Sequence, residues 1–465
     1  MFKNNAVYAN KTVVLMGLSR SMIALAQLLL ESGAKVRISE MNTKDHFPEL
    51  AKDLSALASE VDIEFGKNSP SFFENADLVV VGPGIRMDTK PLDEVHERGT
   101  SIVGEVELLS RDIDVPIIAF AGTSGKTTAA LLTRTIFEAD GKRVFFSGDH
   151  GEPLAQYFQE TSKPDVVLLE LSTAQLENLR NFRPHIAVLT ALQPPFPEKY
   201  PSLEEVSSLF RNVIRNLDEK CFIVYNFRDP NLKSLVMGNP APKRVFRRKN
   251  PISLGPEIMK LYKGCYLNSS RELVWTDSTQ KELYDLRDFM MPGLHNRDNL
   301  MAAVNVVKTM GVASPAIQKG INAFKGVQHR LEFVKKKGGV KIINDSRSVN
   351  VENLKKSLES FSFEPVILIA GGRDAQADFS QIADLVGSRV KTLILVGEAK
   401  EHINRCLGDY SETYLVGTFE EAVLMSYQKS REGDIILLSP GCESYDMFVS
   451  YEERGNYFKK YVEEI

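Results

Sequence analysis

The sequence predicts an α/β protein of three domains, each built on a mostly parallel sheet. Short, continuous apolar runs recur along the chain, for example at 12–17, 77–84, 116–122 and 365–372, and amphipathic stretches such as SMIALAQLLLESG separate them. Continuous apolar strands that alternate with helical patterns indicate parallel sheets covered by helices on both faces. Such a series starts three times, which indicates three domains.

The three starts set the expected domain limits. Residues 1–115 open with VVLMGLSRS, residues 116–326 with a glycine turn ahead of a helix, and residues 327–465 near FKGVQHRLEF. We expect Rossmann-like domains at both ends of the chain and a P-loop ATPase-like domain between them. The basic segment NPAPKRVFRRKNPISLGPE at 239–257 interrupts the pattern, and we expect a loop or an antiparallel sheet edge there.

Composition bounds the class of protein. Of 465 residues, 43% are hydrophobic and 25% are charged, and 57 Lys and Arg against 61 Asp and Glu leave a net charge of −4. No overall basic field therefore draws the chain to nucleic acid or anionic lipid, and no run of about 18 apolar residues predicts a membrane span. We expect a soluble, cytoplasmic monomer. Its four cysteines are far apart in sequence and are expected to be reduced, buried thiols: Cys221, Cys265, Cys406 and Cys442.

The stretch AGTSGKTT at 121–128 has the composition of a phosphate loop, although its Gly-x-x-Gly-Lys-Thr spacing is shorter than the usual P-loop pattern. Glycines let backbone N–H groups turn toward an anion, and the following helix adds its positive N-terminal end. We expect Lys126 to reach a terminal phosphate and Thr127 to place its hydroxyl on Mg²⁺. The alternative is a glycine turn with a solvated lysine. The residues expected to hold ATP are Gly122, Thr123, Ser124, Gly125, Lys126, Thr127 and Thr128.

Three further positions follow apolar strands. Glu170 ends the strand DVVLLE, where a carboxylate could hold Mg²⁺ beside a nucleotide or could be an ordinary strand-edge acid. The turn GLSRSM from Gly17 lacks the later glycines of a dinucleotide fingerprint, so a redox cofactor is not favoured. The turn at Gly82–Ile85 is the second glycine turn of the first domain. Both turns are either tight turns of a sheet or contacts to a nucleotide diphosphate.

The order of these motifs resembles the Mur ligase family. The phosphate loop is followed by LELSTAQLE, GLHNRDN, HR, INDSRSVN, GGRDAQADFS and LLSPGCESYDMFVSYEERGNYF, and the likeness runs from about residue 10 to the C-terminus. It is closest to the MurD type, which joins D-glutamate to UDP-N-acetylmuramoyl-L-alanine in peptidoglycan synthesis. The resemblance implies three domains, for the UDP-linked substrate, for ATP with Mg²⁺ and for the amino acid. It also implies an acyl phosphate, made by ATP on the substrate carboxylate and attacked by the amine.

The resemblance also implies roles for single residues. Lys126 and Glu170 would be catalytic, and Thr127 with Glu170 would hold Mg²⁺. Asn299 would face the adenine, and Arg330 and Asp345 would contact the phosphates and ribose. The residues implied to bind the UDP-linked substrate or the amino acid are Gly17, Leu18, Ser19, Gly82, Pro83, Gly84, Ser172, Arg347, Ser444 and Tyr451.

Several positions depart from the family pattern. The family has a metal-binding histidine where this chain has Phe196, and a carbamylated lysine that supports a second Mg²⁺ where it has Phe210. In the amino-acid site, Arg347 replaces a lysine, Val349 a threonine and Ala375 a lysine. We therefore expect one Mg²⁺ and no carbamylated lysine. Two alternatives stay open beside the MurD-type ligase: a non-catalytic nucleotide-binding relative, and a Mur-type ligase with a different amino acid or acceptor.

Overall fold

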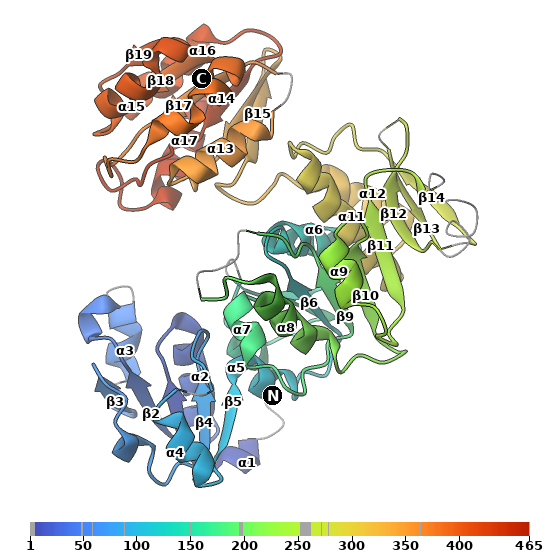
Figure 1. Ribbon diagram of the computed structural model, residues 1–465, viewed down its shortest axis with the longest axis vertical. Coiled ribbons are helices and arrows are strands. Elements are labelled where there is room, and N and C mark those ends of the chain that lie inside the picture. The colour runs from blue at the N-terminus through green and yellow to red at the C-terminus, as the bar shows by residue number, and fades with distance from the viewer. Residues whose placement is uncertain are drawn as a thin grey trace. The chain divides into compact units, whose positions relative to one another are not determined.

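The computed structural model describes residues 5–47, 50–57, 59–87, 89–148, 151–194, 199–251, 262–270, 272–277, 279–361 and 364–464. Contacts divide the chain into two compact units. The first comprises Met1–Asp285 with Asp298–Ile321, and the second comprises Leu286–Arg297 with Asn322–Ile465. The described strands form three sheets with mostly parallel pairing (Figure 1), which confirms the predicted α/β class. The exact domain limits stay a prediction.

The first sheet has the strand order β3-β2-β1-β4-β5, and all its pairs are parallel. The strand order reverses at β1 and β4, and ligands of such sheets bind at that switch point. The strands are β1 Thr12–Met16, β2 Lys35–Glu40, β3 Asp62–Phe65, β4 Leu78–Val81 and β5 Ser101–Gly104. The helices are α1 Asn5–Tyr8, α2 Arg20–Glu31, η1 Lys44–His46, α3 Ala51–Leu57, η3 Pro70–Phe73, α4 Leu92–Glu97 and α5 Glu105–Ser110.

The second sheet has the order β14-β13-β12-β11-β10-β9-β6-β8-β7, parallel from β7 to β12 and antiparallel at β13 and β14. Its strands are β6 Ile117–Ala121, β7 Val144–Ser147, β8 Val166–Glu170, β9 Ile186–Leu189, β10 Phe222–Asn226, β11 Lys243–Arg247, β12 Gly264–Leu267, β13 Leu273–Thr276 and β14 Lys281–Tyr284. The helices of this part of the chain are α6 Lys126–Ala139, η4 Leu154–Gln159, α7 Thr173–Glu177, α8 Leu203–Ile214, α9 Pro230–Leu235, α11 Leu294–Thr309 and α12 Ser314–Ala323.

One sequence expectation for this sheet is wrong. The segment expected to form a loop or an antiparallel edge contains β11, which pairs in parallel with both β10 and β12. Val245 and Phe246 are buried on opposite faces of the strand, and this burial outweighs the basic residues around them. Residues 252–257 of the segment lie outside the described part of the chain.

The third sheet has the order β15-β16-β20-β17-β18-β19, and only the pair β15 and β16 is antiparallel. Its strand β17 is covered on both faces, as the sequence predicted, since alternate side chains enter two separate apolar clusters. The strands are β15 Glu332–Lys337, β16 Val340–Asn344, β17 Val366–Ala370, β18 Val390–Leu395, β19 Glu412–Leu415 and β20 Ile435–Leu438. The helices are α13 Val351–Glu359, η6 Phe379–Ile382, α14 Ala383–Arg389, α15 Lys400–Leu407, η7 Gly408–Tyr410, α16 Phe419–Lys429 and α17 Tyr451–Glu464.

Two smaller expectations concern thiols and membranes. All four cysteines are free, but Cys406 is half-buried rather than buried. Among the described residues, no helix is long and apolar enough to cross a membrane.

A buried carboxylate joins the first part of the chain to the second sheet. Glu107 of α5 is 1% exposed and accepts hydrogen bonds from the backbone N–H groups of Arg180, Asn181 and Phe182 at 3.0–3.1 Å. Arg111 also donates to it, at 2.9 Å. Burial opposes the ionised form, but these hydrogen bonds outweigh burial and lower the pKa of Glu107. The carboxylate therefore satisfies a loop that would otherwise leave buried N–H groups unpaired.

Glu107→Gln should destabilise the fold by about 2 kcal/mol, because an amide cannot replace several charge-assisted hydrogen bonds. The urea midpoint at pH 7 measures this loss. Since the folded pKa of Glu107 is lowered, the difference from wild type should shrink as the pH falls below the ordinary glutamate pKa of about 4.3. The exposed Glu138, paired with Arg134 on α6, is the matched control. Equal midpoints for Glu107→Gln and Glu138→Gln would contradict the anchoring role.

Candidate functional site

The predicted phosphate loop follows β6, which lies between β8 and β9 in the second sheet. Two of its positions have no room for a side chain larger than that of glycine. A Cβ atom on Gly122 would lie 2.0 Å from the Thr190 hydroxyl, and one on Gly125 would lie 2.4 Å from Asn299 Oδ1. Gly125 also has φ +83, in the left-handed region that favours glycine. Either glycine could be replaced only by displacing the loop or these neighbours.

The residues that follow β9 hold the phosphate loop in place by hydrogen bonds. Thr123 N donates to Ala191 O at 2.9 Å, and the Thr190 hydroxyl donates to Ser124 O at 2.5 Å. Thr190 is 6% exposed. Sequence reasoning missed this residue, and its only signal is a place at the end of the apolar run HIAVLT.

A hydroxyl and a carboxylate form a buried pair beside the loop. Thr127 Oγ1 donates to Glu170 Oε1 at 2.6 Å, and both residues are buried, as is Thr128. Lys126 begins α6, and its ammonium donates to Gly122 O at 2.8 Å. Thus residues expected at the phosphates and the metal, from the start of α6 and the end of β8, are brought together.

This pair fits a magnesium ion that takes its other ligands from phosphate and water. Mg²⁺ prefers oxygen ligands, and it is commonly bound through one or two protein groups together with substrate phosphates. Within the described ranges, no group of three or more His, Cys, Asp or Glu gathers to hold a metal by protein ligands alone. The donor set therefore fits a nucleotide-bound ion rather than a closed protein cage.

The two glycine turns of the first domain lie against each other at the carboxyl ends of β1 and β4. A Cβ atom on Gly17 would lie 2.7 Å from Ile85 Cδ1, and Gly82 N donates to Met16 O at 2.8 Å. They meet at the switch point of the sheet, where a ligand is expected. Pro83 and Gly84 of the second turn are exposed.

Glu40, at the end of β2, was missed by sequence reasoning. Its carboxylate is 5% exposed and accepts from Leu18 N at 2.7 Å and from Asn42 N at 2.7 Å. The signal available in the sequence is an acid at the end of the strand KVRISE, as for Glu170.

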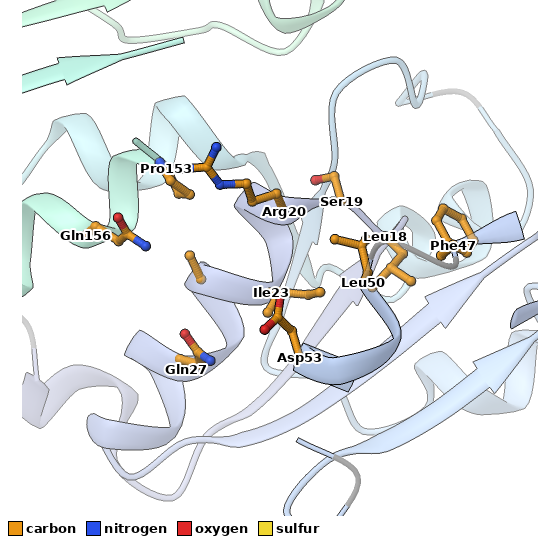
Figure 2. Close-up of a pocket in the computed structure, with 11 residues that line it drawn as sticks. Leu18, Ser19, Arg20, Ile23, Gln27, Phe47, Leu50, Asp53, Pro153 and Gln156 are labelled. Carbon is orange, nitrogen blue, oxygen red and sulfur yellow. The ribbon is translucent and has the colours of Figure 1, made fainter. Parts of the chain in front are cut away.

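A cavity of about 570 Å³ opens beside the first turn (Figure 2). Its volume is in the range of small-molecule sites. Figure 2 shows α2 along the cavity, between Leu50 and Asp53 on one side and Pro153 and Gln156 on the other. The lining residues are Leu18, Ser19, Arg20, Ile23, Ala24, Gln27, Phe47, Leu50, Asp53, Pro153 and Gln156.

Two predicted substrate residues are helix caps. Ser19 caps α2, where its hydroxyl accepts from Met22 N at 3.2 Å. Ser172 caps α7 in a reciprocal capping box with Gln175. Both hydroxyls thus have a structural partner in addition to the predicted substrate.

In the second unit, Asp345 directly follows β16 and is 3% exposed. Its carboxylate accepts from Leu331 N, from the Ser357 hydroxyl and from the Ser439 hydroxyl, at 2.5–3.0 Å. Burial raises its pKa to about 6, against the opposing effect of these hydrogen bonds. Asp345 therefore organises its own domain, whereas Arg330 is exposed.

The predicted amino-acid site lies in the same unit. Ser444 is 0% exposed, and its hydroxyl has no hydrogen-bond partner in the described part of the chain. The Arg347 guanidinium lies 5.8 Å from the centre of the Tyr451 ring, a cation–π distance. Arg454, 1% exposed, donates to the Ser346 hydroxyl at 3.0 Å. Sequence reasoning quoted the motif around Arg454 but did not assign it a role.

The departures from the family pattern have unequal structural support. Phe210 of α8 is 0% exposed and belongs to the apolar core, and its phenyl ring has no atom that could ligate a metal. The next residue, Arg211, is exposed. Phe196 lies outside the described residues. Val349 is half-buried, and Ala375 is exposed.

Comparison with known proteins agrees with this arrangement. Three family models match successive parts of the chain: the Mur ligase MurD-like N-terminal domain at 11–104, the Mur ligase middle domain at 120–307 and the Mur ligase glutamate ligase domain at 329–442. A curated UDP-N-acetylmuramoylalanine--D-glutamate ligase from Bdellovibrio bacteriovorus is 39% identical over 99% of both chains. One of the same name from Geotalea uraniireducens is 36% identical over 97% of both.

A solved structure shares the fold. The MurF ligase from Thermotoga maritima, in complex with ADP, covers 99% of this chain and 97% of its own, with a TM-score of 0.54 and 14% identity. With its three family models and its full-length relatives, the chain belongs to the Mur ligase family of ATP-dependent, amide-forming ligases, as the sequence predicted.

Proposed function

We propose that this protein joins D-glutamate to UDP-N-acetylmuramoyl-L-alanine with ATP. The γ-phosphoryl group of ATP passes to the terminal carboxylate of the UDP-linked substrate, which gives ADP and an acyl phosphate. The amine of D-glutamate then attacks the acyl carbon, loses a proton and expels phosphate, so that an amide remains. The single observation that best supports this function is the phosphate loop with Thr127 and Glu170 paired at 2.6 Å beside it.

Each part of the proposed site has a task. Residues 122–128, with the Lys126 ammonium among them, hold the phosphates. Asn299 lies beside the same loop. Thr127 and Glu170 would hold Mg²⁺, which supplies charge neutralisation for the phosphates. The two glycine turns of the first domain bind the UDP-linked substrate. Arg347, Ser444 and Tyr451 bind the amino acid. For Arg330 and Asp345 of the second unit, contacts to the phosphates and ribose stay a prediction.

Phosphate release tests the reaction. The purified protein should release phosphate from ATP only when both UDP-N-acetylmuramoyl-L-alanine and D-glutamate are present, and the amide product should appear in equal amount by mass spectrometry. Omission of each substrate in turn is the control. Release with another amino acid but not with D-glutamate would contradict the proposed substrate. Clear ATP binding without release, for a full panel of amino acids, would favour a non-catalytic relative.

Lys126→Ala should lower kcat at least about a hundred-fold, because it removes the ammonium expected at the transferred phosphoryl group. The fold should be unaffected, which circular dichroism and the urea midpoint can check. Arg134→Ala, on the same helix and with a side chain that is 43% exposed, is the matched control. Unchanged turnover and unchanged ATP affinity in Lys126→Ala would remove the basis of the phosphate-loop assignment.

The rate should be insensitive to added bicarbonate. A carbamylated lysine needs CO₂, whereas the buried Phe210 has no group that could form a carbamate. Turnover measured in degassed buffer and again with bicarbonate should therefore agree. A rate that rises with bicarbonate in wild-type protein would place a carbamylated lysine elsewhere in the site and would show that the alignment around Phe210 is wrong.

A further inference from the structure

The second glycine turn of the first domain, residues 82–85, is bonded to the part of the chain that carries the second sheet. The Lys199 ammonium donates to Gly84 O at 2.8 Å. The Asn178 side-chain amide donates to Ile85 O at 3.1 Å. Two successive carbonyls of the turn are therefore held by side chains that lie more than 90 positions away in sequence.

A half-buried carboxylate orients Lys199. Glu177, at the end of α7, accepts from Lys199 at 3.0 Å and from the Tyr200 hydroxyl, and Arg86 lies 3.8 Å from its other oxygen. Burial disfavours the charge on Lys199, but hydrogen bonds with Tyr200 and Glu177 outweigh burial and raise the pKa of the ammonium. Lys199 is thus an exposed cation whose ammonium is oriented by acceptors.

The second glycine turn packs against the first glycine turn, which begins at Gly17. A Cβ atom on Gly17 would lie only 2.7 Å from Cδ1 of Ile85. The two turns are therefore in direct contact. Gly84 has φ +87, in the left-handed region that favours glycine. A shift of the Gly84 carbonyl would therefore be passed to Gly17 through Ile85.

The other end of the segment that carries Lys199 is bonded to the phosphate loop. Ala191 O accepts from Thr123 N, and Gln193 N donates to the Thr123 hydroxyl at 3.1 Å. Ala191 and Gln193 thus contact the loop expected to hold ATP, and Lys199 contacts the turn expected to hold the second substrate.

We infer that Lys199 is a positioning residue for the UDP-linked substrate, which acts by holding the Gly84 carbonyl and, through it, both glycine turns of the first domain. This inference rests on the proposed function. Two acceptors orient the Lys199 ammonium, Gly84 O at 2.8 Å and Glu177 at 3.0 Å, and this supports a positioning role.

The test compares Lys199→Met, which keeps the length of the side chain and removes the donor, with Lys199→Arg, which restores a cationic donor. The control is Lys220→Met, because Lys220 is an exposed lysine between α8 and β10. In Lys199→Met, KM for UDP-N-acetylmuramoyl-L-alanine should rise about ten-fold, while kcat and KM for ATP stay within about two-fold. Lys199→Arg should recover most of the loss.

Direct titration of UDP-N-acetylmuramoyl-L-alanine by calorimetry should show the same rise in Kd, and ADP titration should show that each variant is folded. An unchanged KM and Kd in Lys199→Met, or a fall in kcat with KM unchanged, would overturn the inference while leaving the proposed function in place. If the wild-type protein binds the substrate without turnover, the titrations still decide the role of Lys199. If it does not bind the substrate at all, the proposed function and this inference both fail.

Discussion

The parallel register of β8, β6 and β9 is the constraint on which the candidate site depends. Phe120 pairs with Glu170 on one side and with Val188 on the other, so the three strands end at the same level of the sheet. The phosphate loop, the Glu170 carboxylate and Thr190 therefore meet at one edge, although they are far apart in sequence. The space left between them admits only glycine at 122 and 125. A shift of one residue in this register would turn Glu170 to the opposite face and separate it from Thr127.

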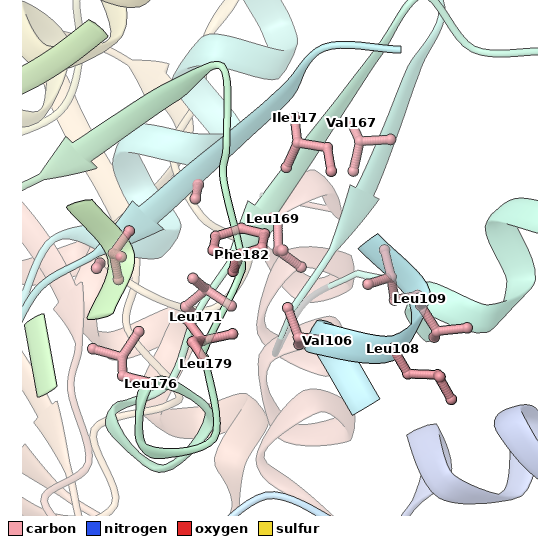
Figure 3. Packing of buried hydrophobic residues seen from close by; sticks show 14 of the residues in the cluster. Val106, Leu108, Leu109, Ile117, Val167, Leu169, Leu171, Leu176, Leu179 and Phe182 are labelled. Carbon is pink, nitrogen blue, oxygen red and sulfur yellow. The ribbon is translucent and has the colours of Figure 1, made fainter. Parts of the chain in front are cut away.

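A shared apolar core joins the domain of the two glycine turns to the second sheet. Figure 3 shows the side chains of α5, including Val106, Leu108 and Leu109, gathered with Leu169 of β8 and with Phe182. The apolar core thus continues from the first sheet to the second, which agrees with their place in one compact unit. The polar contacts of Glu107 and Lys199 lie along the same junction. Apolar burial supplies its stability, and these hydrogen bonds give it a defined geometry.

Positions of the family pattern also have structural roles in the fold. Phe210 lies in a close-packed core, where a lysine would bury an unpaired charge, so the aromatic ring is consistent with its surroundings and inconsistent with a metal. Asp345 illustrates the opposite case. It was expected to contact a nucleotide, yet both its oxygens already accept hydrogen bonds inside its own domain. A motif residue can therefore serve the scaffold that presents a site as well as the site itself.

The sequence by itself determined the features that depend on neighbours in the chain. Continuous apolar strands with helices between them predicted the α/β class, and the glycines and Lys126 ahead of a helix predicted the phosphate loop, because both signals are local. The tertiary structure alone decided which distant groups meet. It placed β11 as a parallel strand although the surrounding residues are basic, because Val245 and Phe246 are buried on its two faces. It also paired Thr190 with the loop, Glu107 with the backbone near Arg180, and Lys199 with Gly84. These contacts join residues from 66 to 115 positions apart, and no local pattern specifies them.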